Sequence, residues 1–203
     1  MRATSTLSPV RQGRRRLLGS CAIAAGLAAL ALGGPARAQV AGTGQIVSGS
    51  GTIAPPQPLG PTAPPNSTQV QVTGPETIIN WTPTDSAPTG GAIDFLPEGN
   101  TLEFYGTGQY TVLNRFVDAG GGSIGRQVAL NGTVNSYIGS PFATGGNAQG
   151  GSIWFYNAGG ILIGSGATLD VGSLVLTSND IDTTGGLFGA GGEIRFRGAS
   201  GST

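Results

Sequence analysis

Two carboxylates, Asp180 and Asp182, are the residues with the clearest capacity for chemistry, and they stand two positions apart. On a β-strand this spacing places both side chains on one face. Paired carboxylates hydrolyse glycosidic bonds or hold Ca²⁺, so one candidate function is a β-helical carbohydrate-active enzyme. The alternative is that both groups are solvated in a turn that follows Leu174, Val175 and Leu176. We expect the turn, and therefore no enzymatic activity, no cofactor and no metal site.

The first 38 residues have the pattern of a cleaved signal peptide. Arg14, Arg15 and Arg16 precede an apolar run over positions 17–32, and Ala36-Arg37-Ala38 supplies a small-x-small cleavage site before Gln39. The run is shorter than the ~20 residues of a membrane span. We expect export through the periplasm, by the general secretory or the twin-arginine route, to the cell surface or the medium, with no membrane span in the mature chain.

Removal of this segment leaves a chain without cysteine or histidine, two residue types that many catalytic sites require. The only cysteine, Cys21, departs with the signal, and the sequence has no histidine. Sites of the Ser-His-Asp, Cys-His and His- or Cys-ligated zinc types are therefore excluded. Four arginines face ten carboxylates after Gln39, a net charge of −6, which disfavours nucleic acid as a partner.

The elements that must position these residues are short strands. Positions 39–67 are rich in Gly, Ser and Pro, and we expect a disordered linker there. From Thr68 onward, short apolar runs alternate with Gly- and Asn-rich turns, which is typical of strands. The runs lie within these segments: 69–72, 77–81, 92–95, 101–105, 110–116, 127–134, 153–156, 161–163 and 174–176.

Two spacings indicate that these strands belong to a repeating coil. Ile153 and Leu174 are similar strand positions about 21 residues apart, and positions 150–155 resemble positions 191–196 at about twice that offset. The sequence therefore predicts an all-β solenoid, a parallel β-helix of about six turns over residues 68–203. Because positions 198–203 offer no capping element, we also expect further turns to follow Thr203.

Three segments resemble a known family in the same order. They are Thr77-Ile78-Ile79-Asn80-Trp81-Thr82, then Tyr110 to Phe116 with its Leu113-Asn114-Arg115, and then Gly150 to Ile181. The chain resembles the filamentous-haemagglutinin-like secretion domain of two-partner secretion exoproteins. Where that family has an Asn-Pro-Asn-Gly turn, this chain has Asn157-Ala158-Gly159-Gly160, so Asn157 and Gly160 are kept. Gly159 is expected to adopt the left-handed conformation that Asn tolerates.

The resemblance implies both a fold and a role. It implies a right-handed parallel β-helix that is passed to an outer-membrane β-barrel transporter and folds at the cell surface as an adhesin-type domain. Host or surface glycans are further candidate partners. The resemblance also implies a transporter-recognition and turn motif, made of Asn80, Trp81, Asn114, Arg115, Asn157, Gly159 and Gly160.

Overall fold

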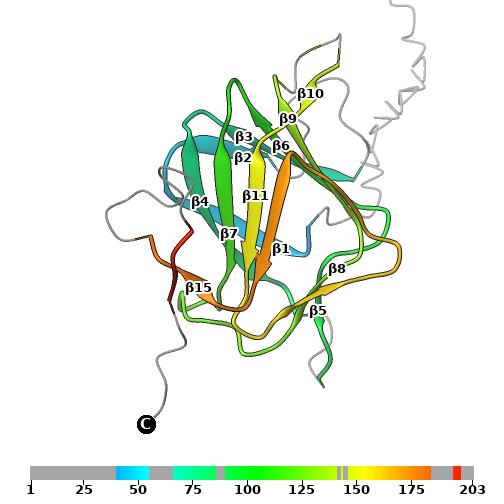
Figure 1. Ribbon diagram of the computed structural model, residues 1–203. Coiled ribbons are helices and arrows are strands. Elements are labelled where there is room, and N and C mark those ends of the chain that lie inside the picture. The colour runs from blue at the N-terminus through cyan, green and yellow to red at the C-terminus, as the bar shows by residue number, and fades with distance from the viewer. Residues whose placement is uncertain are drawn as a thin grey trace, which may run out of the picture. The chain divides into compact units, whose positions relative to one another are not determined.

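The computed structural model describes residues 40–54, 66–85, 90–140, 143, 146–183 and 194–197. These residues form an all-β structure with several mixed sheets and no helix (Figure 1). Within this described part there is accordingly no helix with the length and apolar character that a membrane crossing requires. The expected signal peptide, residues 1–38, lies outside the described residues.

Three sheets make up the body of the structure. Sheet A contains, in spatial order, β1 (Gly42–Ser48), β4 (Glu76–Pro83), β7 (Thr111–Phe116), β11 (Ser152–Tyr156) and β14 (Ser173–Thr177). Sheet B contains β2 (Gly51–Ala54), β3 (Ser67–Val72), β6 (Thr101–Gly106), β9 (Thr133–Ile138) and β10 (Ala148–Gln149), with β13 (Thr168–Asp170) also paired to β9. Sheet C contains β5 (Ile93–Leu96), β8 (Val128–Leu130) and β12 (Ile161–Ile163).

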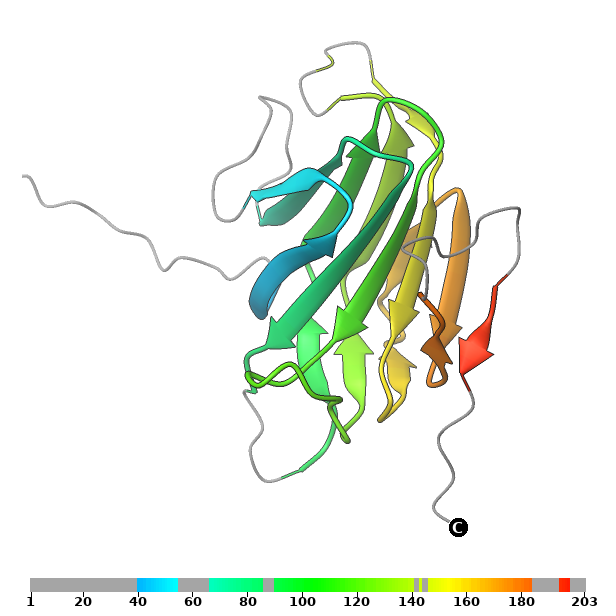
Figure 2. The ribbon, with the colours of Figure 1, turned by 90° about the vertical axis from the view of Figure 1, so that its left-hand side faces the viewer.

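From β3 onward the chain passes through the sheets in the repeating order B, A, C, and we call one such passage a circuit. Apart from β10, which pairs antiparallel with β9, each strand of a later circuit in these sheets is parallel to the equivalent strand one circuit earlier, as in β4, β7, β11 and β14. Figure 2 shows these strands of sheet A side by side. Because equivalent positions pair directly, Ile78, Leu113, Trp154 and Val175 form one row across the sheet.

The core lies between the three sheets, and strand alternation supplies it. Every second residue of β3, β4, β6, β7, β9 and β11 points inward, in agreement with the period of two along a strand. Aromatic rings stack through the centre: Trp81 packs edge-on against Phe95 at 5.3 Å and Phe95 against Phe116 at 4.9 Å. Phe116 then lies parallel to Phe155 of the next circuit at 6.1 Å.

The segment before Thr68 corrects our expectation of a disordered lead-in. Residues 42–54 form β1 and β2, which pair antiparallel with β4 and β3 respectively. Ile46 and Ile53 from these strands pack against the core. The composition is poor in apolar residues, but the open edges of the first circuit supply backbone partners that composition does not reveal. Positions 55–65, the proline-rich part, lie outside the described residues.

The expected number of circuits and one of the two repeat spacings also need correction. Ser152 and Ser173, 21 residues apart, do stack on adjacent strands, so that spacing is one circuit. Earlier circuits are longer, as in the 34 residues between the hydrogen-bonded Gln69 and Glu103, so the described residues hold four parallel strands in sheet A rather than about six. Phe196 belongs to β16 (Phe196–Arg197), which pairs antiparallel with β15 (Asp180–Ile181) and does not continue the stack.

The paired edge of β1 yields a stability prediction. Replacing Ile46, which packs on the core, with Ala should lower the free energy of unfolding by roughly 1–2 kcal/mol, since apolar contacts are lost at a partly buried site. The neighbouring Val47 is 47% exposed on the other face, so Val47→Ala should change it by less than about 0.5 kcal/mol. Chemical denaturation of both variants measures the difference, and equal effects would mean that β1 does not cap the core.

Candidate functional site

The two carboxylates that could do chemistry are both engaged by arginines. An oxygen of Asp180 lies 3.1 Å from Nη2 of Arg115, and an oxygen of Asp182 lies 2.6 Å from Nη2 of Arg197. Each carboxylate is therefore paired with an arginine, and Asp180 is half-buried at the start of β15 (Asp180–Ile181) rather than in the solvated turn that we expected. In the described part of the chain, no group of three or more acidic, His or Cys side chains is arranged to hold a metal ion.

Trp81 and Asn114, two residues of the motif, form a buried bridge between circuits. Asn114 points into the core between β4 and β11 and is fully buried. Its Oδ1 accepts a hydrogen bond from the indole Nε1–H of Trp81 at 2.9 Å, and its Nδ2 donates to the backbone carbonyl of Trp154 at 3.1 Å. One amide thus joins three successive strands and satisfies polar groups that would otherwise be buried unpaired.

Asn80 and Arg115, the two other residues of these strands, lie on the outer face of sheet A. They are register partners, and Tyr156 continues their row on β11. The guanidinium of Arg115 lies 5.8 Å from the centroid of the Tyr156 ring, which is within cation–π range, and it also makes the ion pair with Asp180. Through the Arg115–Asp180 ion pair, this row connects β15, which follows β14 in the sequence, to β7.

An apolar row lies beside this polar row and is covered. Ile78, Leu113 and Trp154 are each no more than 5% exposed although they face outward from sheet A. Ile181 of β15 and Ile194, which precedes β16, pack against them as a second small core. Sheet A thus has apolar packing on both faces, which accounts for the nearly continuous apolar runs in β4 and β11.

Asn157 holds the corner between sheets A and C. Its side chain is fully buried, and Nδ2 donates both to the carbonyl of Arg126 at 2.8 Å and to that of Gly160 at 2.6 Å. The carbonyl of Asn157 in turn accepts from the Gly160 N–H at 2.9 Å. Arg126, one circuit earlier, donates through Nη2 to the carbonyl of Gly91 at 2.9 Å and forms an ion pair with Asp85. Corners of three successive circuits are linked in this way.

The two glycines of this turn have different roles from the one expected. The left-handed residue is Gly160, with φ of +93°, where a side chain would strain the backbone. A Cβ at Gly159 would lie 2.2 Å from the backbone carbonyl oxygen of Arg126, so Gly159 is needed for close approach. Our expectation of a left-handed Gly159 is therefore wrong, and an Asn at that position would not fit this corner.

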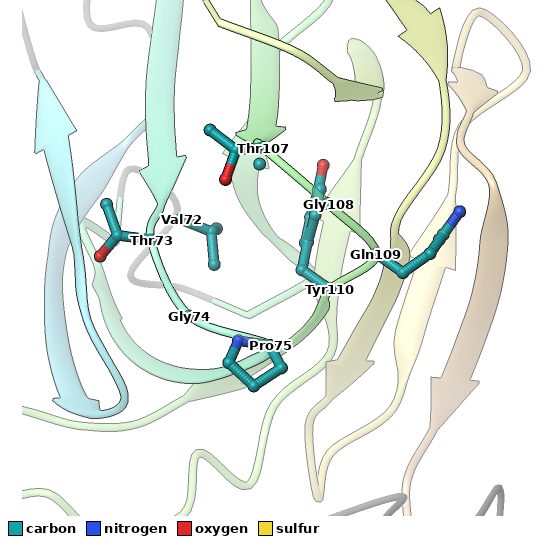
Figure 3. Close-up of a pocket in the computed structure, with 9 residues that line it drawn as sticks. Val72, Thr73, Gly74, Pro75, Thr107, Gly108, Gln109 and Tyr110 are labelled. Carbon is teal, nitrogen blue, oxygen red and sulfur yellow. The ribbon is translucent and has the colours of Figure 1, made fainter.

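A hollow of about 210 Å³ lies at the corner between sheets B and A (Figure 3). Residues 72–75 and 106–110 line it, and Tyr110 is the one titratable side chain among them. The hydroxyl of Tyr110 accepts a hydrogen bond from the Tyr137 N–H at 3.3 Å, and burial raises the pKa of Tyr110 well above its usual range. With no acid–base pair among its lining residues, the hollow offers no catalytic constellation.

The motif residues thus separate into three places: the core bridge, the outer row of sheet A and the corner turn. Sequence reasoning missed their partners Tyr156, Arg126 and Asp85, since pairs far apart in sequence become neighbours only through the register of the circuits. A scan against protein-family models gave no match for the chain, and a search of curated proteins gave none either.

The core bridge can be tested by mutation. Asn114→Ala should lower the free energy of unfolding by roughly 2–4 kcal/mol, because it leaves the Trp81 indole N–H without its acceptor and opens a void. Asn179, which is exposed after β14, provides the control, and Asn179→Ala should change stability by less than about 0.5 kcal/mol. Denaturant titration of both proteins checks this, and similar values would show that the bridge contributes little.

The buried phenol of Tyr110 gives a pH prediction. Its pKa is higher in the folded than in the unfolded chain, so its contribution to stability is complete below the usual pKa of 10.0 and is lost as the pH rises above that value. Tyr110→Phe should reduce the loss of stability above pH 10, by at most about 1.4 kcal/mol per pH unit. Unfolding curves across the alkaline range measure the slope, and an unchanged slope would contradict the assignment.

Proposed function

We propose that this chain is an exported secretion domain of the two-partner type, a right-handed parallel β-helix that is delivered to an outer-membrane β-barrel transporter. The observation that carries the proposal is that the three motif segments stack on one another. Segments around Asn80, Asn114 and Asn157 are far apart in sequence, yet they occupy successive strands of sheet A and the corner that follows it. Parallel crossovers are right-handed in about 98% of cases, which supports the handedness.

The contacts support a role in folding rather than in chemistry. Asn114 and Asn157 each join strands or corners of different circuits. Asn114 gains its hydrogen bond to Trp154 when the next circuit is in place, and Asn157 bonds back to Arg126 of the circuit before it. A chain that emerges at the cell surface would gain these hydrogen bonds one circuit at a time. Stacking of successive circuits outside the membrane would then favour onward movement of the chain without a nucleotide cofactor.

The location and partners follow from the same proposal. A cleaved signal over residues 1–38 would bring the chain to the periplasm, and the transporter would release it to the medium or retain it at the surface. The chain would act through display and folding, with no reaction of its own. The engagement of Asp180 and Asp182 by Arg115 and Arg197 favours this assignment over that of a glycoside hydrolase, which needs two carboxylates flanking one bond.

Secretion assays with the corner turn provide the test. The chain is produced together with its outer-membrane β-barrel partner, and the fraction in the medium is compared with that in the periplasm. The double variant Asn157→Ala, Gly160→Ala should accumulate in the periplasm, because it loses the hydrogen bond to Arg126 and acquires a strained residue at φ of +93°.

The exposed Ala158 of the same turn provides the matched control. Ala158→Ser alters the sequence of the turn without touching either interaction, so it should be secreted as the parent chain is. Normal secretion of the double variant would overturn the role of the turn. Equal secretion of the parent chain with and without the barrel partner would overturn the two-partner assignment itself.

A further inference from the structure

The outer face of sheet B differs sharply from that of sheet A. Inward positions such as Val70, Phe104 and Val134 belong to the core, so the alternate positions point outward. Register pairing arranges the outward residues of β3, β6, β9, β10 and β13 in three rows, and in these five strands every one is polar or is a tyrosine; on the edge strand β2, Thr52 and Ala54 extend two of the rows. The rows are Ser67, Thr101, Thr133 and Thr168; Gln69, Glu103, Asn135 and Asp170; and Gln71, Tyr105, Tyr137 and Gln149.

One part of this polar grid is buried and fixed. Glu103 is 3% exposed, and its Oε2 accepts hydrogen bonds from Nε2 of Gln69 at 2.9 Å and from the hydroxyl of Tyr105 at 3.1 Å. Burial, with the neighbouring Glu103 carboxylate, raises the pKa of Tyr105, so the phenol remains a donor. The ring of Tyr105 lies 5.1 Å from that of Tyr137 at a tilt of 32°. The buried Glu103 carboxylate therefore orients Tyr105 through a hydrogen bond, and the Tyr105 ring packs against that of Tyr137.

The other part of the grid is open to solvent. Tyr137 and Asn135 on β9 are half-buried, whereas Thr168 and Asp170 on β13 and Gln149 on β10 are exposed. The side chain of Gln149 donates from Nε2 to a carboxylate oxygen of Asp170 and to the carbonyl of Val171 at 3.3 Å, which orients both groups. β9, β10 and β13 lie side by side at this end of the sheet. An aromatic ring is thus flanked by amide and carboxylate groups on a regular surface.

We propose that this surface, centred on Tyr137 with Asn135, Gln149 and Asp170, binds an uncharged, extended saccharide chain. The face of a tyrosine ring packs against the apolar face of a pyranose, while amide and carboxylate oxygens accept hydrogen bonds from its hydroxyls. The rows run across strands that repeat at about 4.8 Å, so polar groups recur along the path of a linear glycan. The inference is independent of the proposed secretion role.

The negative charge of this surface favours an uncharged saccharide over an anionic one. Glu103 and Asp170 are the two charged members of the three rows, and no row contains a basic residue. An anionic polysaccharide or a nucleic acid would therefore meet like charge without a cation to offset it. A protein surface is the weaker candidate, because the one aliphatic side chain that extends these rows is the small Ala54 on the edge strand β2, which cannot form the apolar centre of a stable interface.

Nuclear magnetic resonance titration of the full chain provides the test. Cellohexaose and mannohexaose are the uncharged probes, and hexagalacturonate is the anionic probe of matched length. We expect the uncharged probes to shift backbone amide signals of β9, β10 and β13. Tyr137→Ala should weaken binding about tenfold and Asp170→Asn about fivefold, whereas Tyr137→Phe should retain most of it, because the ring is kept.

Asp118→Asn is the matched control, since Asp118 lies in the exposed loop after β7 and its Oδ1 accepts hydrogen bonds from the N–H groups of Gly120 and Gly122, which Asn can also accept. It should bind the uncharged probes as the parent chain does. Absence of shifts with both uncharged probes would overturn the proposal. So would tighter binding of hexagalacturonate, or binding that Tyr137→Ala leaves unchanged in a protein whose β-sheet circular dichroism is intact.

Discussion

In-register pairing between circuits is the constraint on which the rest of the structure depends. Each parallel strand after the first circuit has its backbone partners in the equivalent strand one circuit earlier, as Ser152 to Tyr156 have in Thr111 to Arg115. A slip of one residue would turn every inward side chain outward. The core therefore exists only while the register holds, and Phe116 can stack on Phe155 because their strands are aligned. Side chains that fix the register thus act on the whole stack.

Two buried asparagines, Asn114 and Asn157, fix the register between circuits. Asn114 bonds both to Trp81 of the preceding circuit and to Trp154 of the following one, and Asn157 bonds back to Arg126. A buried amide tolerates little displacement, since a misplaced partner leaves a polar atom unpaired in an apolar surrounding. Apolar contacts stabilise many registers almost equally, whereas these bonds form in one. The asparagines therefore give the stack specificity that its aliphatic core lacks.

Sequence reasoning predicted the all-β class, most of the strands from Thr68 onward and the 21-residue circuit that joins Ile153 to Leu174. These features depend on local alternation and on turn residues, which a single sequence displays. It did not predict β1 and β2, because their pairing depends on edges formed by β3 and β4. It also assigned Gly159 the left-handed conformation that Gly160 adopts. The need for glycine at position 159 comes from the close approach of the Arg126 backbone, which is a tertiary contact that the sequence does not display. The resemblance of positions 191–196 to positions 150–155 did not indicate another circuit, because Phe196 pairs antiparallel with Ile181.

The antiparallel strands β1 and β2 give the stack a polarity. They occupy the edges of β4 and β3 in the first circuit, whereas on the opposite side of sheet A the pairing is parallel as far as β14. The edge of β14 is therefore the side of sheet A on which a further parallel strand could pair. The two antiparallel strands thus supply the first circuit with backbone partners on the side where no earlier circuit exists, and each later circuit takes its alignment from the strand on which it pairs.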